Sequence, residues 1–118
     1  MSRRCLIVDD NALYLGEARA LLQRQGLSVV GVASNGGDAL ALAAAARPDV
    51  ALVDVDLGAE SGLDVARALA PLPVILISAY AESDLRELLD DSPAVGFLAK
   101  SVVSRAAIDG LLGDPPAG

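Results

Sequence analysis

The sequence predicts an α/β protein in which helices cover both faces of a five-stranded parallel sheet, a doubly wound (βα)5 architecture. Five short apolar runs alternate with longer segments that carry a helical pattern, and strictly alternating strands and helices form parallel sheets through right-handed crossovers. Most runs are continuously apolar, which is typical of strands buried on both faces. The chain has 118 residues, the size of one domain.

The predicted strands are rich in β-branched residues, as strands usually are. In chain order they are Cys5–Val8, Ser28–Ala33, Val50–Val53, Val74–Ile77 and Val95–Ala99.

The segments between the strands have helical periodicity and recognisable ends. The first places apolar residues at 15, 18, 21 and 22 on one stripe and stops before Gly26, a residue that often ends helices. The third opens on Ser61-Gly62-Leu63-Asp64, which resembles a capping box. The predicted helices are Ala12–Gln25, Asp38–Ala46, Ser61–Ala70, Glu82–Asp91 and Ser104–Leu112.

Composition excludes several classes of function. Hydrophobic residues make up 53% of the chain, enough for a core, and the net charge is −7, which argues against nucleic-acid binding by this domain alone. The chain has no histidine, so histidine-based catalysis and histidine metal ligands are excluded. Its one cysteine cannot form an internal disulfide.

The ends of the chain suggest no targeting segment. The apolar run near the start has four residues and leads directly into two aspartates, whereas a secretory signal needs roughly 7–15 apolar residues. No stretch approaches the ~20 apolar residues of a membrane span. We therefore expect a cytoplasmic chain with no membrane partner, a domain over residues 1–113, and a tail or the start of a linker at 114–118.

Polar residues follow four of the predicted strands. Asp9 and Asp10 follow the first, Asp54 the third with Asp56 two positions later, Ser78 the fourth and Lys100 the fifth. The carboxyl ends of parallel strands meet at one edge of the sheet, where such folds bind ligands. We therefore expect these side chains to share a pocket.

These residue types fit phosphoryl transfer to an aspartate. Clustered carboxylates disfavour ionisation unless a cation enters, and Mg²⁺ typically takes one or two carboxylates with water and a phosphate oxygen. Lys100 is the only lysine in the chain, and an ammonium pairs with a carboxylate or a phosphoryl oxygen. Each residue alone also has an ordinary explanation as a turn or strand-end residue; the combination indicates a site.

Five segments stand in order at these strand ends and in the loop after the third strand. They are Ile7–Asn11, Leu52–Leu57, Ser61–Gly62, Ile75–Ala79 and Gly96–Lys100. With them, residues 3–112 resemble the receiver domain of a bacterial two-component response regulator. The resemblance implies a flavodoxin-like sheet with the strand order 2-1-3-4-5.

The resemblance also implies a role for each matching residue. Asp54 would be the phospho-acceptor, Ser78 the hydroxyl that senses the phosphoryl group, and Lys100 the partner of a phosphoryl oxygen. Phe97 would be the aromatic switch. The Mg²⁺ ligands would be Asp9, Asp10, Asp54 and the backbone carbonyl of Asp56.

The implied partner is a sensor histidine kinase or a phosphotransfer protein. The domain would catalyse only its own phosphorylation and dephosphorylation and is otherwise no enzyme. The face formed by the fourth helix, fifth strand and fifth helix would then switch a partner, a homodimer or an attached effector, such as a DNA-binding transcription regulator.

The sequence departs from the family pattern at two positions. Ser101 follows Lys100 where the family commonly has a proline after a cis bond, and Gly58 stands where proline is frequent. Because a cis bond before a residue other than proline costs about 2.5–4 kcal/mol, we expect the bond after Lys100 to be trans.

Three other functions are compatible with parts of this sequence. A haloacid-dehalogenase phosphatase would carry its Asp-x-Asp signature on the first strand, whereas Asp54-Val55-Asp56 follows the third. A nucleotide-binding domain would need a glycine-rich first turn, and Asp9-Asp10-Asn11 would repel a pyrophosphate. The remaining alternative is a receiver-like interaction module that works without phosphorylation.

Overall fold

The computed structural model describes residues 3–79 and 92–113. It confirms a sheet of five parallel strands in the order β2-β1-β3-β4-β5. The strands are β1 (Arg4–Val8), β2 (Ser28–Ala33), β3 (Val50–Asp54), β4 (Val74–Ser78) and β5 (Gly96–Ala99). This order places the carboxyl ends of β1, β3, β4 and β5 side by side along one edge of the sheet.

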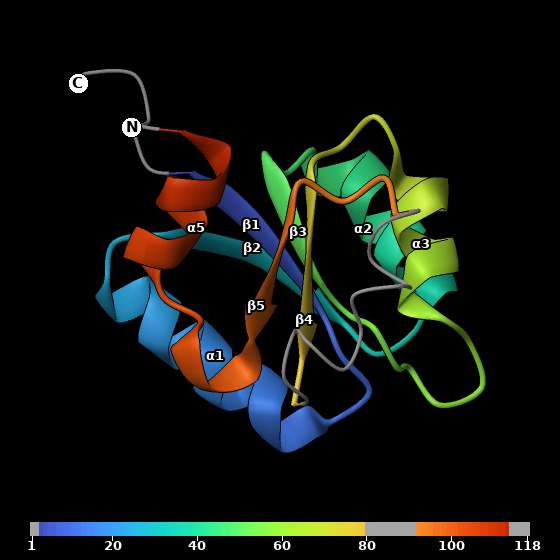
Figure 1. Cartoon of the computed structure of the whole chain (residues 1–118), viewed down its shortest axis with the longest axis horizontal. Coiled ribbons are helices and arrows are strands. Elements are labelled where there is room, and N and C mark those ends of the chain that lie inside the picture. Colours follow the sequence, from blue (N-terminus) through green and yellow to red (C-terminus); the bar gives the residue numbers. More distant parts are fainter. Residues whose placement is uncertain (1–2, 80–91, 114–118) are drawn as a thin grey trace.

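Helices cover both faces of the sheet (Figure 1), so the predicted doubly wound architecture is confirmed. One face carries α1 and α5, and the other carries α2 and α3. The described helices are α1 (Ala12–Arg24), α2 (Gly36–Ala46), α3 (Gly62–Leu69), the short 3₁₀ helix η2 (Lys100–Val102) and α5 (Arg105–Leu112). The predicted helix Glu82–Asp91 and the predicted tail at 114–118 lie outside the described residues.

The core divides into two layers because successive strand residues point to opposite faces of the sheet. On β1, Cys5 and Ile7 pack toward α1 and α5, while Leu6 and Val8 pack toward α2 and α3. The central strands β3 and β4 are buried along their whole length. These strands are continuously apolar because both of their sides face a layer of helices, as predicted.

Several element boundaries differ from the prediction. β3 and β4 each include the polar residue expected to follow them, Asp54 and Ser78, because both still pair with the neighbouring strand. α2 begins at Gly36, two residues early, because the side chain of Asn35 accepts a hydrogen bond from the Asp38 N–H and caps it there. Every other described end matches the prediction or differs from it by one residue.

The expected serine cap of α3 is present, but its bonding differs from a capping box. The Ser61 hydroxyl accepts a hydrogen bond from the Leu63 N–H at 3.2 Å. The Asp64 carboxylate pairs with Arg67 at 3.1 Å.

Within residues 3–79 and 92–113, no helix has the length and apolar character needed to cross a membrane.

Candidate functional site

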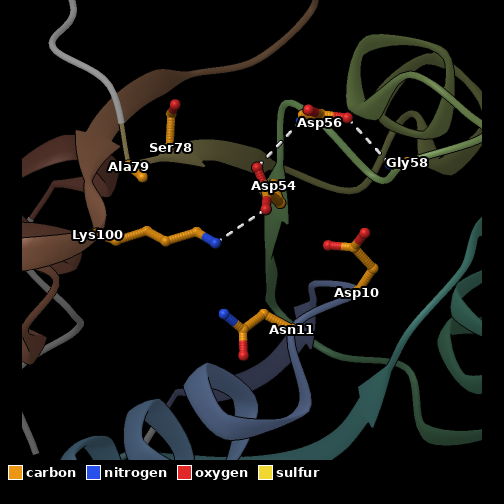
Figure 2. A pocket seen from close by; sticks show the side chains of 8 residues that line it. All are labelled: Asp10, Asn11, Asp54, Asp56, Gly58, Ser78, Ala79 and Lys100. Atoms are coloured by element: carbon orange, nitrogen blue, oxygen red, sulfur yellow. Dashed lines mark hydrogen bonds and ion pairs between the residues drawn. The ribbon is translucent and has the colours of Figure 1, made fainter.

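The carboxyl-terminal edge of the sheet holds a pocket of about 210 Å³ (Figure 2). Its lining residues come from the ends of β1, β3 and β4, the loop after β3, and the turn after β5: Asp10, Asn11, Asp54, Asp56, Gly58, Ser78, Ala79 and Lys100. The structure thus brings together the polar residues expected there. Asp9 lies beside the pocket and is fully buried.

Asp54 stands at the centre of this pocket, at the end of β3 (Figure 2). Its Oδ1 accepts a hydrogen bond from the Asp56 N–H at 3.0 Å, and its Oδ2 lies 2.9 Å from Lys100 Nζ. Burial raises the pKa of the Asp54 carboxyl, and the charge of Asp9 adds to this; the Lys100 and Asp56 hydrogen bonds oppose it without cancelling it. The ionised form of Asp54 is therefore disfavoured here, and a further cation would favour it.

Asp9 and Asp10 bring two more carboxylates to Asp54. One oxygen from each of the three lies within 4.8 Å of the others. Asp9 Oδ1 accepts a hydrogen bond from the Asn11 N–H at 2.9 Å, and Oδ2 lies 2.6 Å from Lys100 Nζ. Asp10 is exposed. Three carboxylates against one ammonium leave a net charge of −2 at the cluster, which favours a divalent cation.

Lys100 supplies the positive charge of the cluster. It follows β5 directly and opens η2. Burial lowers the pKa of Lys100, but hydrogen bonds to Asp9 and Asp54 outweigh this and leave the pKa above its usual value. The Lys100–Ser101 bond is trans, as expected for a non-proline residue. The ammonium reaches both buried carboxylates without the cis-proline turn common in the resembled family.

The loop after β3 is shaped by hydrogen bonds within it. The Asp56 carboxylate accepts from the Gly58 N–H at 3.0 Å, and Gly58 has φ +76°, which favours glycine. The Gly62 N–H donates to the Val55 carbonyl at 2.8 Å. A Cβ at Gly62 would lie 1.9 Å from the Asp54 backbone oxygen, so this close approach requires glycine.

The two residues assigned to the switch lie on neighbouring strands. Ser78 ends β4 and lines the pocket. Phe97 lies on β5 opposite Leu76, is half-buried, and packs against the core layer beneath α2 and α3. The switch assigned to this pair stays a prediction.

Sequence reasoning missed two residues at the site. Asn11 has no role of its own in the sequence prediction, yet its side chain accepts a hydrogen bond from the Tyr14 N–H at 3.1 Å and caps α1 beside the pocket. An asparagine just before a helical pattern is a recognised cap signal that could have identified it. Tyr14 contacts Lys100 across 86 positions of the chain, and no local pattern marks such a contact.

A family comparison matches residues 5–110 to the response regulator receiver domain. The chain belongs to that family. The match covers β1 from Cys5 onward, the other four strands, α1 to α3, η2 and most of α5. The family is a signalling domain of two-component systems, and the predicted fold and resemblance are confirmed.

Individual relatives agree with this assignment. The transcriptional regulatory protein PdtaR of Mycobacterium tuberculosis is 33% identical over 83% of this chain and 49% of its own length. The receiver domain of the putative response regulator NarL from the same species is 34% identical, with a TM-score of 0.79 over 95% of this chain and 98% of that one.

A third relative was solved in a chemically informative state. It is a response regulator of Burkholderia pseudomallei that contains a phosphorylated aspartic acid, a calcium ion and citrate. It is 28% identical, with a TM-score of 0.79 over 93% of this chain and 66% of that one. The present chain spans about half the length of PdtaR. The functions of the other half of such relatives therefore do not transfer to this chain.

Proposed function

We propose that this receiver domain accepts a phosphoryl group on Asp54 from a phosphohistidine, with Mg²⁺ bound in the same pocket. The donor would be a sensor histidine kinase or a phosphotransfer protein. The observation that carries the proposal is the position of Asp54: a buried carboxylate, 6% exposed, lies on a pocket between an ammonium and two further carboxylates.

The side chains present fit a magnesium ion. Their donors are carboxylate oxygens, which Mg²⁺ prefers, and the pocket leaves room for the water ligands that Mg²⁺ usually retains. Asp9, Asp10 and Asp54 would hold the ion together with the backbone carbonyl of Asp56. When bound, Mg²⁺ would supply positive charge against the developing negative charge of the phosphoryl oxygens.

The chain's own residues then account for the transfer. An Asp54 carboxylate oxygen attacks phosphorus, the P–N bond to the donor imidazole breaks, and the leaving nitrogen takes a proton from solvent. Lys100, already 2.9 Å from Asp54 Oδ2, is close enough to turn to a phosphoryl oxygen. Hydrolysis of the resulting acyl phosphate by water returns Asp54 and inorganic phosphate.

The output would be read on the side of the sheet near β5. Ser78 would bond the phosphoryl group, and Phe97 would repack between its present half-buried position and a deeper one. Val95 and Val102, which flank β5, are exposed large apolar residues. We propose that this face, together with the helix predicted at Glu82–Asp91, binds a partner, a second copy of the chain or an attached effector.

Two relatives support these details without testing them in this chain. The Burkholderia pseudomallei regulator carries a phosphorylated aspartic acid and a calcium ion, the two components proposed here for one pocket, with Mg²⁺ as the ion. PdtaR is a transcriptional regulatory protein of about twice the length matched, which suits an effector that acts on transcription.

Incubation with acetyl phosphate and Mg²⁺, followed by intact-mass measurement, tests the proposal. We expect one added phosphoryl group in the native chain, none in Asp54→Asn, and none with EDTA in place of Mg²⁺. Asp64→Asn is the matched control because Asp64 is an exposed carboxylate on α3. A native chain that stays unmodified while still binding a partner would favour the phosphorylation-independent interaction module.

A further inference from the structure

We infer that Tyr14 is a positioning residue that holds Lys100 in the pocket from both ends of the lysine. This rests on the proposed function, in which Lys100 pairs with a phosphoryl oxygen. Tyr14 lies on the first turn of α1, far from Lys100 in sequence but beside it in the fold.

Two contacts join the residues. The Tyr14 hydroxyl donates a hydrogen bond to the Lys100 carbonyl oxygen at 3.3 Å, and Lys100 Nζ lies over the Tyr14 ring, 4.8 Å from its centroid. A cation within about 6 Å of an aromatic ring is attracted to the ring face. One side chain thus fixes the backbone of Lys100 and also covers its charged end.

Lys100 lies where β5 ends and a short helix begins. It opens a three-residue 3₁₀ helix, η2, that lacks a side-chain cap hydrogen bond, and the bond to Ser101 is trans. A lysine side chain has many rotamers on its flexible stem, and this freedom must be lost before the ammonium can serve one fixed position. The ring of Tyr14 reduces that loss by limiting the space open to Nζ.

Tyr14 is itself held in place. Its N–H donates to the capping side chain of Asn11 at 3.1 Å, and its ring packs against the core layer beneath α1 and α5. Burial raises the pKa of Tyr14 to about 12, while the charge of Lys100 opposes that rise. The hydroxyl therefore stays protonated near neutral pH and remains a hydrogen-bond donor.

Because Lys100 is the only lysine, lysine-selective ¹³C labelling gives its side-chain NMR signals without overlap. We expect the ε-methylene protons of the native chain to resonate upfield of a free lysine because of the ring. Tyr14→Phe keeps the ring and should retain the shift, and Tyr14→Leu should lose it. Signals that stay in place in Tyr14→Leu would overturn the inference, even if the native chain takes no phosphoryl group.

Phosphorylation kinetics test the consequence. At saturating Mg²⁺ we expect the acetyl phosphate rate constant to fall about tenfold in Tyr14→Leu and less in Tyr14→Phe, while the Mg²⁺ dissociation constant changes less than about twofold. Leu112→Ala is the control, since Leu112 packs against the same core layer and is not expected to touch Lys100. A rate constant unchanged in Tyr14→Leu, or lowered equally in Leu112→Ala, would contradict the positioning role.

Discussion

At the scale of single residues, Asp54 places a carboxyl group where burial disfavours its charged form. Its pKa is raised by burial and by Asp9, so the folded state favours the protonated form more than the unfolded state does. The stabilising contribution of Asp54 is therefore fully present below the pKa that Asp54 has in the unfolded chain. It is lost as the pH rises through the pKa that Asp54 has in the folded chain. At neutral pH the ionised carboxylate weakens the fold.

Asp54→Asn should accordingly stabilise the metal-free domain at neutral pH. Urea unfolding in EDTA should show a higher midpoint for Asp54→Asn than for the native chain at pH 7. The gap should narrow as the pH falls through the raised pKa of the folded state and be closed below ~4, the usual aspartate pKa. Asp64→Asn, at an exposed carboxylate, should show no such gap. A native chain more stable than Asp54→Asn at pH 7 would contradict the stated cost of burying this charge.

Asp10 differs from Asp9 because it is exposed, whereas Asp9 is fully buried and ion-paired with Lys100. Asp10→Asn should change the free energy of unfolding without metal by less than about 0.5 kcal/mol. It should weaken Mg²⁺ binding roughly 10-fold or more, since one of the few charged ligands is lost. Calorimetric titration with Mg²⁺ measures this, and unchanged affinity would remove Asp10 from the metal site.

At the scale of elements, the loop from β3 to α3 depends on one glycine. A Cβ at Gly62 would meet the backbone of Asp54 and Val55, and backbone cannot move aside cheaply. Gly62→Ala should therefore cost about 3 kcal/mol in urea unfolding and displace Asp54.

The matched control for this glycine is Gly16→Ala in the exposed middle of α1, where a Cβ meets nothing within 4 Å. It should gain about 0.5–1 kcal/mol, because alanine is the better helix former. Equal effects at the two positions would show that the close approach at Gly62 is not decisive.

The elements themselves could be predicted from the sequence, because their signals are local. Continuous apolar runs marked strands buried on both faces, and β2 appears with the bounds predicted. Boundaries were less certain because hydrophobicity does not report backbone pairing: Asp54 and Ser78 are polar and still pair within the sheet. The start of α2 depends on the Asn35 side-chain bond to the Asp38 N–H, which an apolar pattern does not contain.

At the scale of the whole molecule, the site exists because the sheet order places β1 between β2 and β3, and β4 between β3 and β5. Family resemblance, not periodicity, supplied that order in advance. Once known, it brings Asp9, Asp54 and Lys100 together from distant parts of the chain. The contact between Tyr14 and Lys100 could not be predicted from the sequence. It requires the first turn of α1 to lie beside the residue that follows β5, and no single segment encodes that.

Magnesium should stabilise the whole domain, since the unfolded chain has no assembled pocket. Mass action adds about 2.7 kcal/mol at 100 times the dissociation constant, so the urea midpoint should rise with Mg²⁺ concentration. Asp10→Asn, with its roughly 10-fold weaker affinity, should gain only about 1.4 kcal/mol at the same Mg²⁺ concentration. A native midpoint that does not change with Mg²⁺ would mean that the three carboxylates do not form a metal site.

The most direct test of the account is to locate the phosphoryl group. The native chain is treated with acetyl phosphate and Mg²⁺, the acyl phosphate is reduced with borohydride, and the converted residue is found by peptide mass spectrometry. We expect conversion at Asp54 alone. Conversion at another carboxylate, or none in a folded chain with Mg²⁺ present, would contradict it.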